Sequence, residues 1–328
     1  MTRRLISPRR WTPPPFRRTE ATGPLVITRR LPTGASGAED VAFDAEGRVV
    51  TGGYDGRVLR LDPVTGASTE VGRTGGRPLG LEPQGDGSVL VCDHDRGLLH
   101  VQADGTVQVL VDAVDGEPLT FASNVVRTAD GSTWFTTSTS RWDVEEHLGD
   151  VFEHSCTGRL VRRSPDGAVT TVLRGLKFAN GLVLAPDGSH LLLAETTGYR
   201  IWRYWLTGGS AGTAELLVRD LPGFPDNMSL GSDGLLWVAV AAPRDPLLDR
   251  LLPLPGWIRT LVWNLPEAVK PAATPVAWVL AYTLDGRLVH DLRSTDASFG
   301  FVTAVAERDG TLVVSSLHEG DVAVVEKP

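Results

Sequence analysis

One nine-residue pattern recurs six times along the chain, and no other feature of the sequence constrains the fold as strongly. Each copy begins with a short run of apolar and small polar residues and ends in Asp-Gly or Glu-Gly, after which a second run of β-forming residues follows. The copies occupy residues 39–47, 79–87, 123–131, 180–188, 226–234 and 302–310. Asp-Gly between two β-forming runs is typical of a hairpin turn. We therefore expect repeated antiparallel hairpins.

A further pair of β-forming runs follows most copies, so that each unit holds about four strands. Arg57–Leu61 and Arg200–Tyr204 are examples of these later runs. A four-stranded unit cannot bury both of its faces alone, and six such units predict an all-β, six-bladed β-propeller with four-stranded blades. A pair of β-sandwiches is the alternative. Leu25–Arg29 is expected to pair with Val322–Val325 as the outermost strand of the last blade and so to close the ring.

Two blades carry insertions after their second strand, at about residues 138–158 and 242–276. Second-to-third connections open on the face where the first strands begin, which we call the top face. Both insertions are therefore expected over the same mouth of the axial channel. The 242–276 insertion reads as short helical pieces rich in leucine and tryptophan, and it predicts a lid, a homodimer contact or an interfacial surface. Residues 1–22 form a basic, proline-rich arm that is either solvated or docked through Trp11, and residues 23–328 form the propeller.

The charge distribution argues against nucleic acid as a partner. The chain has 32 Lys and Arg against 40 Asp and Glu, and residues 1–30 hold eight of the arginines but only one acidic residue. The remaining, strongly acidic body repels phosphate backbones. No apolar run reaches the roughly 20 residues of a membrane-spanning helix. Two cysteines cannot build a disulfide framework, which favours a reducing cytoplasm.

The first residues of the repeats are chemically alike. Position one is Glu39, Asn180 and Asp226 in three copies, and the third copy offers Ser123 or, one residue later, Asn124. The innermost strands of a propeller converge on its axis, so these side chains are expected to meet there. Carboxylate and amide oxygens without His or Cys suit a hard divalent cation, above all Ca²⁺. The alternative for each single residue is that it only terminates a strand.

Several longer stretches are more specific than the repeat itself. They are Trp11–Pro15, Gly149–Leu160, Phe178–Gly188, Ala194–Tyr204 and Leu221–Gly234. On these stretches the chain resembles the senescence-marker-protein/gluconolactonase family, and within it the bacterial branch that is similar to strictosidine-synthase-like proteins. The resemblance runs from about Trp11 to the C-terminus.

The resemblance implies a six-bladed propeller with a divalent metal, usually calcium, at the top of the channel. The family's metal ligands fall on Glu39, Asn180 and Asp226, and its remaining Asn ligand falls on Ser123 by the turn spacing, with Asn124 beside it. We take Asn124 as the fourth ligand, because a β-bulge would bring it into place. The implied activity is hydrolysis of a lactone or ester, with Asp226 acting on water or on the substrate.

Other residues and other function classes stay open. His154 and Thr303 are further substrate-contact candidates, together with Ser123. The catalytic Glu of strictosidine synthases falls on Val302 or Thr303, so their condensation chemistry is not supported. A specialised biosynthetic enzyme acting on a small molecule and a non-catalytic binding module are the alternatives, and other divalent cations compete with Ca²⁺ for the same ligands.

Overall fold

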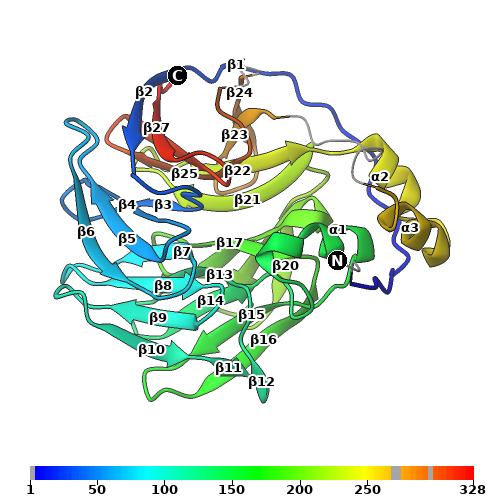
Figure 1. Cartoon of the computed structure of the whole chain (residues 1–328), viewed down its shortest axis with the longest axis horizontal. Helices are drawn as coiled ribbons and strands as arrows, with labels where there is room; N and C mark the ends of the chain where they lie inside the picture. The colour runs from blue at the N-terminus through cyan, green and yellow to red at the C-terminus, as the bar shows by residue number, and fades with distance from the viewer. Residues whose placement is uncertain (1–3, 267–274, 295–297) are drawn as a thin grey trace.

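The computed structural model describes residues 4–266, 275–294 and 298–328, and it shows a six-bladed β-propeller. Six separate sheets stand around one axis (Figure 1). In each blade the chain runs from the innermost strand outward through antiparallel neighbours, apart from two outermost strands that come from the start of the chain. The predicted fold class is confirmed.

The first three blades follow one another directly in the sequence. Their strands are β3 (Val41–Phe43), β4 (Val49–Gly52), β5 (Arg57–Leu61) and β6 (Ser68–Arg73); β7 (Pro78–Pro83), β8 (Val89–Asp93), β9 (Gly97–Val101) and β10 (Val107–Val111); and β13 (Ala122–Arg127), β14 (Thr133–Thr137), β15 (Gly158–Arg163) and β16 (Val169–Leu176). A small hairpin of β11 (Ala113–Val114) and β12 (Glu117–Pro118) lies between blades 2 and 3 in the sequence.

The last three blades include the two strands that come first in the chain. Their strands are β17 (Ala179–Leu184), β18 (His190–Glu195), β19 (Arg200–Trp205) and β20 (Ala214–Val218); β21 (Gly223–Leu230), β22 (Leu236–Pro243), β23 (Ala277–Tyr282), β24 (Leu288–Ser294) and β1 (Gly23–Pro24); and β25 (Val302–Arg308), β26 (Thr311–Ser316), β27 (Asp321–Val325) and β2 (Ile27–Pro32). The strand β1 pairs in parallel with β24 and gives blade 5 a fifth strand.

Closure of the ring joins the two ends of the chain. The strand β2 pairs antiparallel with β27, with Ile27 opposite Val325 and Pro32 opposite Asp321. This is the predicted closure, with the strand beginning two residues later than expected. Blade 6 thereby has four strands, with β2 outermost.

The hydrophobic core is divided into layers between neighbouring blades. One such layer contains Val50 and Val58 of blade 1 with Leu81, Val91 and Leu99 of blade 2, all of them buried. Because a strand exposes alternate side chains on its two faces, each blade contributes to the layer before it and to the layer after it. The packing therefore fixes the angle between blades and holds the inner strands close together.

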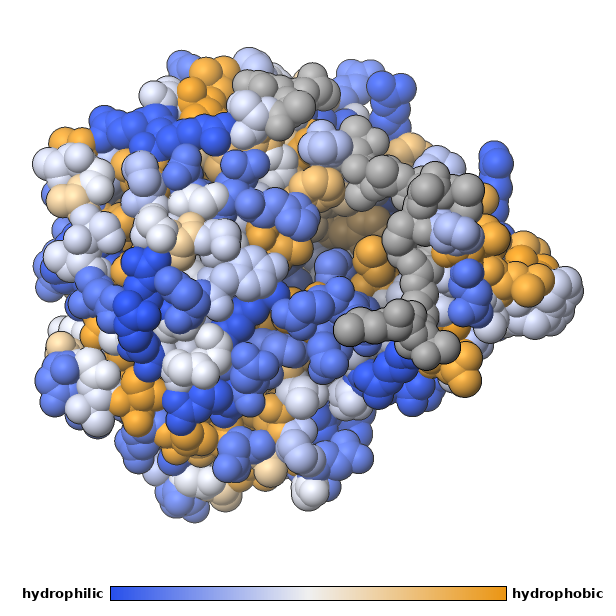
Figure 2. Space-filling view, in the orientation of Figure 1, coloured by the Kyte–Doolittle hydropathy of each residue, from blue (hydrophilic) through white to orange (hydrophobic). Residues whose placement is uncertain are grey.

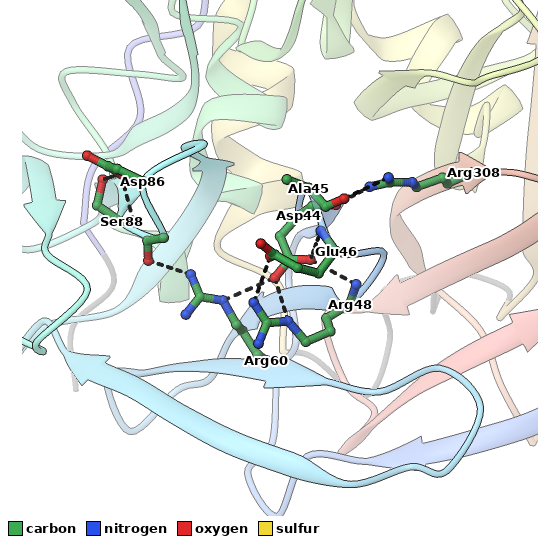
Figure 3. Close-up of polar contacts among 9 residues, drawn as sticks. Asp44, Ala45, Glu46, Arg48, Arg60, Asp86, Ser88 and Arg308 are labelled. Carbon is green, nitrogen blue, oxygen red and sulfur yellow. Dashed lines mark hydrogen bonds and ion pairs between the residues drawn. The ribbon is translucent and has the colours of Figure 1, made fainter.

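The Asp-Gly turns lie on the bottom face and are tied to one another by arginines. The Asp44 carboxylate, only 2% exposed, lies 2.8 Å from Arg48 Nε and 3.2 Å from Arg60 Nε (Figure 3). Arg308 at the end of β25 donates to the Asp44 and Ala45 carbonyls, and Arg60 donates to the Gly87 carbonyl at 2.5 Å. These contacts link the turns of blades 6, 1 and 2.

The two insertions contain the α-helices that the structure describes. The first holds a 3₁₀ turn, η1 (Val144–Glu146), and α1 (Leu148–Glu153), and the second holds α2 (Pro246–Leu251) and α3 (Gly256–Trp263). A second 3₁₀ turn, η2 (Thr196–Gly198), follows β18. Figure 1 shows α2 and α3 at one edge of the ring, near α1, and α3 contacts α1. No described helix is long and apolar enough to cross a membrane.

The N-terminal arm is docked between the two insertions. Arg9 N donates to Glu153 O at 2.8 Å, and Trp11 N donates to Leu252 O at 3.2 Å. The buried Arg259 of α3 donates to the carbonyls of Arg9 and Phe152. The arm therefore joins α1 to the α2–α3 segment.

Candidate functional site

A β-bulge stands at the first two repeat positions of the inner strands. Pairing between first and second strands is interrupted at the start of five blades, between Pro78 and Leu81, Ala122 and Val125, Ala179 and Leu182, Pro225 and Met228, and Val302 and Ala304. A bulge re-aims side chains at the end of a strand. Both the position-one and the position-two side chains are thereby drawn into contacts between blades.

Three of the predicted position-one residues form a chain of hydrogen bonds from blade 3 to blade 5. The Ser123 hydroxyl donates to Asn180 Oδ1 at 2.8 Å, and Asn180 Nδ2 donates to Asp226 Oδ1. Glu39 of blade 1 is reached through Asn227, whose Nδ2 lies 3.3 Å from Glu39 Oε2. The structure thus gathers Glu39, Ser123, Asn180 and Asp226 at the top of the inner strands.

The two carboxylates of this cluster influence each other. Burial raises the pKa of Glu39 to about 7, against the lowering effects of Arg77 and of the Asn227 hydrogen bond. Burial also raises the pKa of Asp226 well above its ordinary value, and the charge of Glu39 raises it further. Asp40, one residue after Glu39, has its pKa raised well above its usual range by the same two causes. Negative charge is therefore costly here without a cation.

The cluster fits a divalent metal by its chemistry. Glu39 accepts from Asn227 Nδ2, Asp226 accepts from Asn180 Nδ2 and from the Asn227 backbone, and each residue keeps 7% of its surface exposed. Within the described ranges, no three His, Cys, Asp or Glu side chains are placed to hold a metal together. A cation at this point would accordingly need the amide oxygen of Asn180 beside the two carboxylates, which is a ligand set for a hard ion.

Asn124 is engaged differently from Ser123. Its Oδ1 accepts from Leu182 N at 3.2 Å, and its Nδ2 donates to Asn227 Oδ1 at 3.1 Å. Asp40 has the corresponding role in blade 1, since it accepts from Leu81 N at 2.9 Å. Each of these side chains thus accepts a hydrogen bond from the inner strand of the next blade. The geometry places Ser123, rather than Asn124, beside Asn180.

Glycine makes this close approach of the inner strands feasible. A Cβ on Gly80 would lie 2.3 Å from Ser123 O, and one on Gly181 would lie 2.6 Å from Asp226 O. Such distances are shorter than any real contact between these atoms. The position-two glycines of blades 2 and 4 therefore let the inner strands of neighbouring blades converge.

The other predicted contact residues lie beside different partners. The Thr303 hydroxyl donates to Glu39 O at 2.7 Å, and Ser315 Oγ donates to the same carbonyl at 3.1 Å, so Thr303 holds the Glu39 backbone. His154 is buried and stacks on Trp11 of the arm, with ring centroids 4.3 Å apart. Burial, followed by nearby positive charges, lowers the pKa of His154 to about 3. The described contacts of His154 are with the arm rather than with the oxygen cluster.

An apolar wall at the channel mouth was not expected from the sequence. Phe121 and Phe178 meet edge to face, with centroids 5.3 Å apart, and they pack in one buried cluster with Leu79 and with Val144 of η1. The first insertion therefore reaches the mouth. A signal was present, because phenylalanine stands two residues before position one in three copies, at Phe121, Phe178 and Phe224. The face drawn in Figure 2 is hollowed near its middle.

Comparison with known proteins identifies the family. The model of the SMP-30/gluconolactonase/LRE-like region matches residues 51–245, more than half of the chain. The chain belongs to this SMP-30/gluconolactonase family. The strictosidine synthase-like N-terminal model matches residues 28–61. The Arabidopsis thaliana protein STRICTOSIDINE SYNTHASE-LIKE 13 is 33% identical over 307 residues, which cover 84% of this chain and 74% of that protein.

Solved structures of the SMP-30/gluconolactonase type share the fold. A gluconolactonase from Xanthomonas campestris aligns with a TM-score of 0.66 at 18% identity and covers 97% of this chain and 99% of its own. A calcium-binding protein, regucalcin from Agrobacterium tumefaciens, aligns with a TM-score of 0.63 at 16% identity, covering 94% of this chain and 98% of its own. At these identities the likeness concerns the propeller itself.

Proposed function

We propose that the chain is a metal-dependent hydrolase of a lactone or ester, with calcium as the metal its ligands suit best. The observation that carries this proposal is the buried cluster of Glu39, Asn180 and Asp226, in which two carboxylates lie with an amide and the charge of Glu39 raises the pKa of Asp226. Membership of a family whose structural neighbours include a gluconolactonase and a calcium-binding regucalcin supports the same assignment.

The residues of the cluster have separate parts in this mechanism. Glu39, Asn180 and Asp226 would hold the cation, and Ser123 would supply a fourth oxygen or the contact that orients Asn180. When bound, a divalent cation supplies Lewis-acid polarisation of the scissile carbonyl. The Asn180 amide donates to Asp226 Oδ1 and orients this carboxylate, which would in turn orient the attacking water.

Hydrolysis then follows from proton transfer at Asp226. As the water oxygen bonds to the carbonyl carbon, Asp226 Oδ2 accepts a water proton, and the carbon–oxygen bond to the leaving alkoxide breaks. The same proton is returned to the alkoxide, which leaves as an alcohol. A carboxylate in this position is worth about 10²- to 10⁴-fold in rate.

A second reading is a biosynthetic enzyme related to the strictosidine synthase-like proteins. The sequence relatives and the aromatic wall of Phe121 and Phe178 favour it. The position that would carry a catalytic Glu holds Val302, which is fully buried, or Thr303, whose hydroxyl is bonded to Glu39 O. An acid–base step of the condensation type therefore has no residue here to perform it.

The deciding experiment combines metal analysis with activity on a panel of lactones and esters, with and without chelator. We expect the purified protein to bind one divalent cation and to lose turnover with chelator. Asp226→Asn should lower kcat/KM by at least about 100-fold, whereas Asp285→Asn, an exposed carboxylate, should leave it unchanged. Turnover that survives both chelator and Asp226→Asn would remove the cluster from the chemistry.

A matched pair of variants decides the fourth ligand. Ser123→Ala should weaken cation binding measured by calorimetry and leave the free energy of unfolding nearly unchanged. Asn124→Ala should instead destabilise the fold by about 1–3 kcal/mol, because it leaves Leu182 N without its acceptor. The reverse result would assign the ligand to Asn124, as the sequence alone suggested.

A further inference from the structure

Arg77 is a buried guanidinium for which the proposed hydrolysis provides no role. It stands two residues before Leu79, immediately before β7, at the top of blade 2. Its side chain is only 4% exposed, and none of its three nitrogens has a hydrogen-bond partner among the described residues. A buried cation that donates no hydrogen bond is costly unless a ligand completes it.

Two residues near the strands of blade 1, Tyr54 and Gly37, hold Arg77 in place. The guanidinium lies over the ring of Tyr54, with its carbon 3.6 Å from the ring centroid. Tyr54 in turn occupies the space over Gly37, where a Cβ would lie 1.9 Å from the tyrosine ring. Gly37 also has φ +69°, which favours glycine. Stacking fixes the plane of the guanidinium and leaves its N–H edges for a ligand.

Arg77 lies on the metal-cluster side of the mouth. Its charge lowers the pKa of Glu39, and together with His318 it contributes, after burial, to lowering the pKa of His147 in the first insertion. Among the described residues its ion-pair partner is Glu145, at 3.6 Å, and the Glu145 side chain is 66% exposed. Because Glu145 is exposed and the separation exceeds hydrogen-bond length, this pair contributes little and is readily displaced.

The unsatisfied charge of Arg77 favours an anionic ligand. Its buried guanidinium has no hydrogen-bond acceptor among the described residues, and an anionic group at the mouth would supply one. The apolar wall of Leu79, Phe121 and Phe178 lies at the same mouth. A ligand with a carboxylate and an apolar body would satisfy both features.

We propose that Arg77 binds a carboxylate of the substrate, so that the preferred substrates are carboxylate-bearing lactones or esters with an apolar portion. That the ligand is a substrate rests on the proposed hydrolase function. Binding of a carboxylate to Arg77 does not itself require turnover. A planar carboxylate can accept two parallel N–H bonds from the edge of a stacked guanidinium, which is the strongest pairing that arginine makes.

The test uses benzoate as an anionic probe and benzamide as its neutral counterpart, titrated calorimetrically into the full-length protein with calcium present. We expect benzoate to bind, benzamide to bind at least tenfold more weakly, and Arg77→Gln to weaken benzoate at least tenfold. Arg77→Lys should recover part of the affinity. Glu145→Gln, on the exposed rim, should tighten benzoate binding by removing a competing carboxylate.

Two controls separate this inference from the hydrolase proposal. Arg77→Gln should still bind calcium at least as well as the wild type, because a positive charge near the ion has been removed. Asp226→Asn, which tests the cluster, should retain a benzoate affinity that depends on Arg77. In turnover, Arg77→Gln should raise KM for carboxylate-bearing esters only.

Equal benzoate affinity in the wild type and Arg77→Gln would overturn the inference, even if neutral lactones are hydrolysed. Arg77-dependent binding of benzoate without any turnover would support it and refute the hydrolase. If Arg77→Gln fails to fold, an unchanged affinity in Glu145→Gln overturns the inference on its own.

Discussion

Adjacent residues at the start of one inner strand have different partners, and Ser123 and Asn124 illustrate this. Ser123 donates to Asn180 of the oxygen cluster, whereas Asn124 is bonded to the backbone of the next blade and to Asn227. The bulge between Ala122 and Val125 permits this division, because it inserts one extra residue between paired positions. Residue type alone would have assigned the ligand role to the asparagine.

Glu82, on the inner strand of blade 2, gives a pH-dependent prediction at the residue scale. Burial raises the pKa of Glu82 to about 8, whereas an unfolded glutamate titrates near 4.5. The folded state therefore binds the proton more tightly, so stability from this group is full below pH about 4.5 and is lost as the pH rises through about 8. Glu82→Gln should gain stability relative to the wild type between pH 5 and pH 8.

Urea unfolding of both proteins at the two pH values measures this difference. Glu326→Gln, which removes an exposed carboxylate, serves as the control for the loss of one charge. Parallel stability curves for the wild type and Glu82→Gln would show that the Glu82 carboxyl titrates normally.

At the scale of strands and turns, the bottom face is stabilised by the Asp44 network of blade 1. Asp44→Ala removes the acceptor of Arg48 and Arg60 and of two turn amides, and it leaves a nearly buried guanidinium nitrogen without its partner. We expect a loss of about 1–3 kcal/mol in the free energy of unfolding.

Glu46→Ala is the matched control in the same turn. The Glu46 side chain is 63% exposed and pairs only with Arg48 at the surface, so its removal should cost less than about 0.5 kcal/mol. Both values come from denaturant titration. Similar costs for the two variants would mean that burial of Asp44 adds nothing.

The strand pattern was predictable from the sequence because each turn fixes a register. Counting back from Asp-Gly places Glu39, Ser123, Asn180 and Asp226 at equivalent points, and the structure brings these four together. The rim of the mouth was not predictable in the same way. Arg77 stacks on Tyr54 and its charge acts on His147 of the first insertion, and no repeat relates these three residues.

At the scale of the whole molecule, apolar surface is concentrated on the second insertion and the arm beside it. Trp257 and Leu261 of α3 are 65% and 61% exposed, and hydrophobic residues gather at that edge of the molecule in Figure 2. The arm passes between α1 and α3, an arrangement that the sequence left open because nothing in an arginine- and proline-rich stretch specifies its partner.

A homodimer through this surface stays a prediction. Because exposed tryptophan and leucine are costly in water, we expect the wild type to be dimeric by light scattering after size-exclusion chromatography, and Trp257→Glu with Leu261→Glu to be monomeric. Val109→Glu, at an exposed position on β10, should remain dimeric. A monomeric wild type would refute the prediction.

The pairing of β2 with β27 has a consequence for how the protein is made. Residues 27–32 are synthesised long before their partner at 321–325. Until that partner has been made, the nascent chain carries one unmatched strand, and the blades already folded form an open arc. The sixth sheet forms only when these two distant segments meet, so contacts far apart in sequence make this step of folding slow.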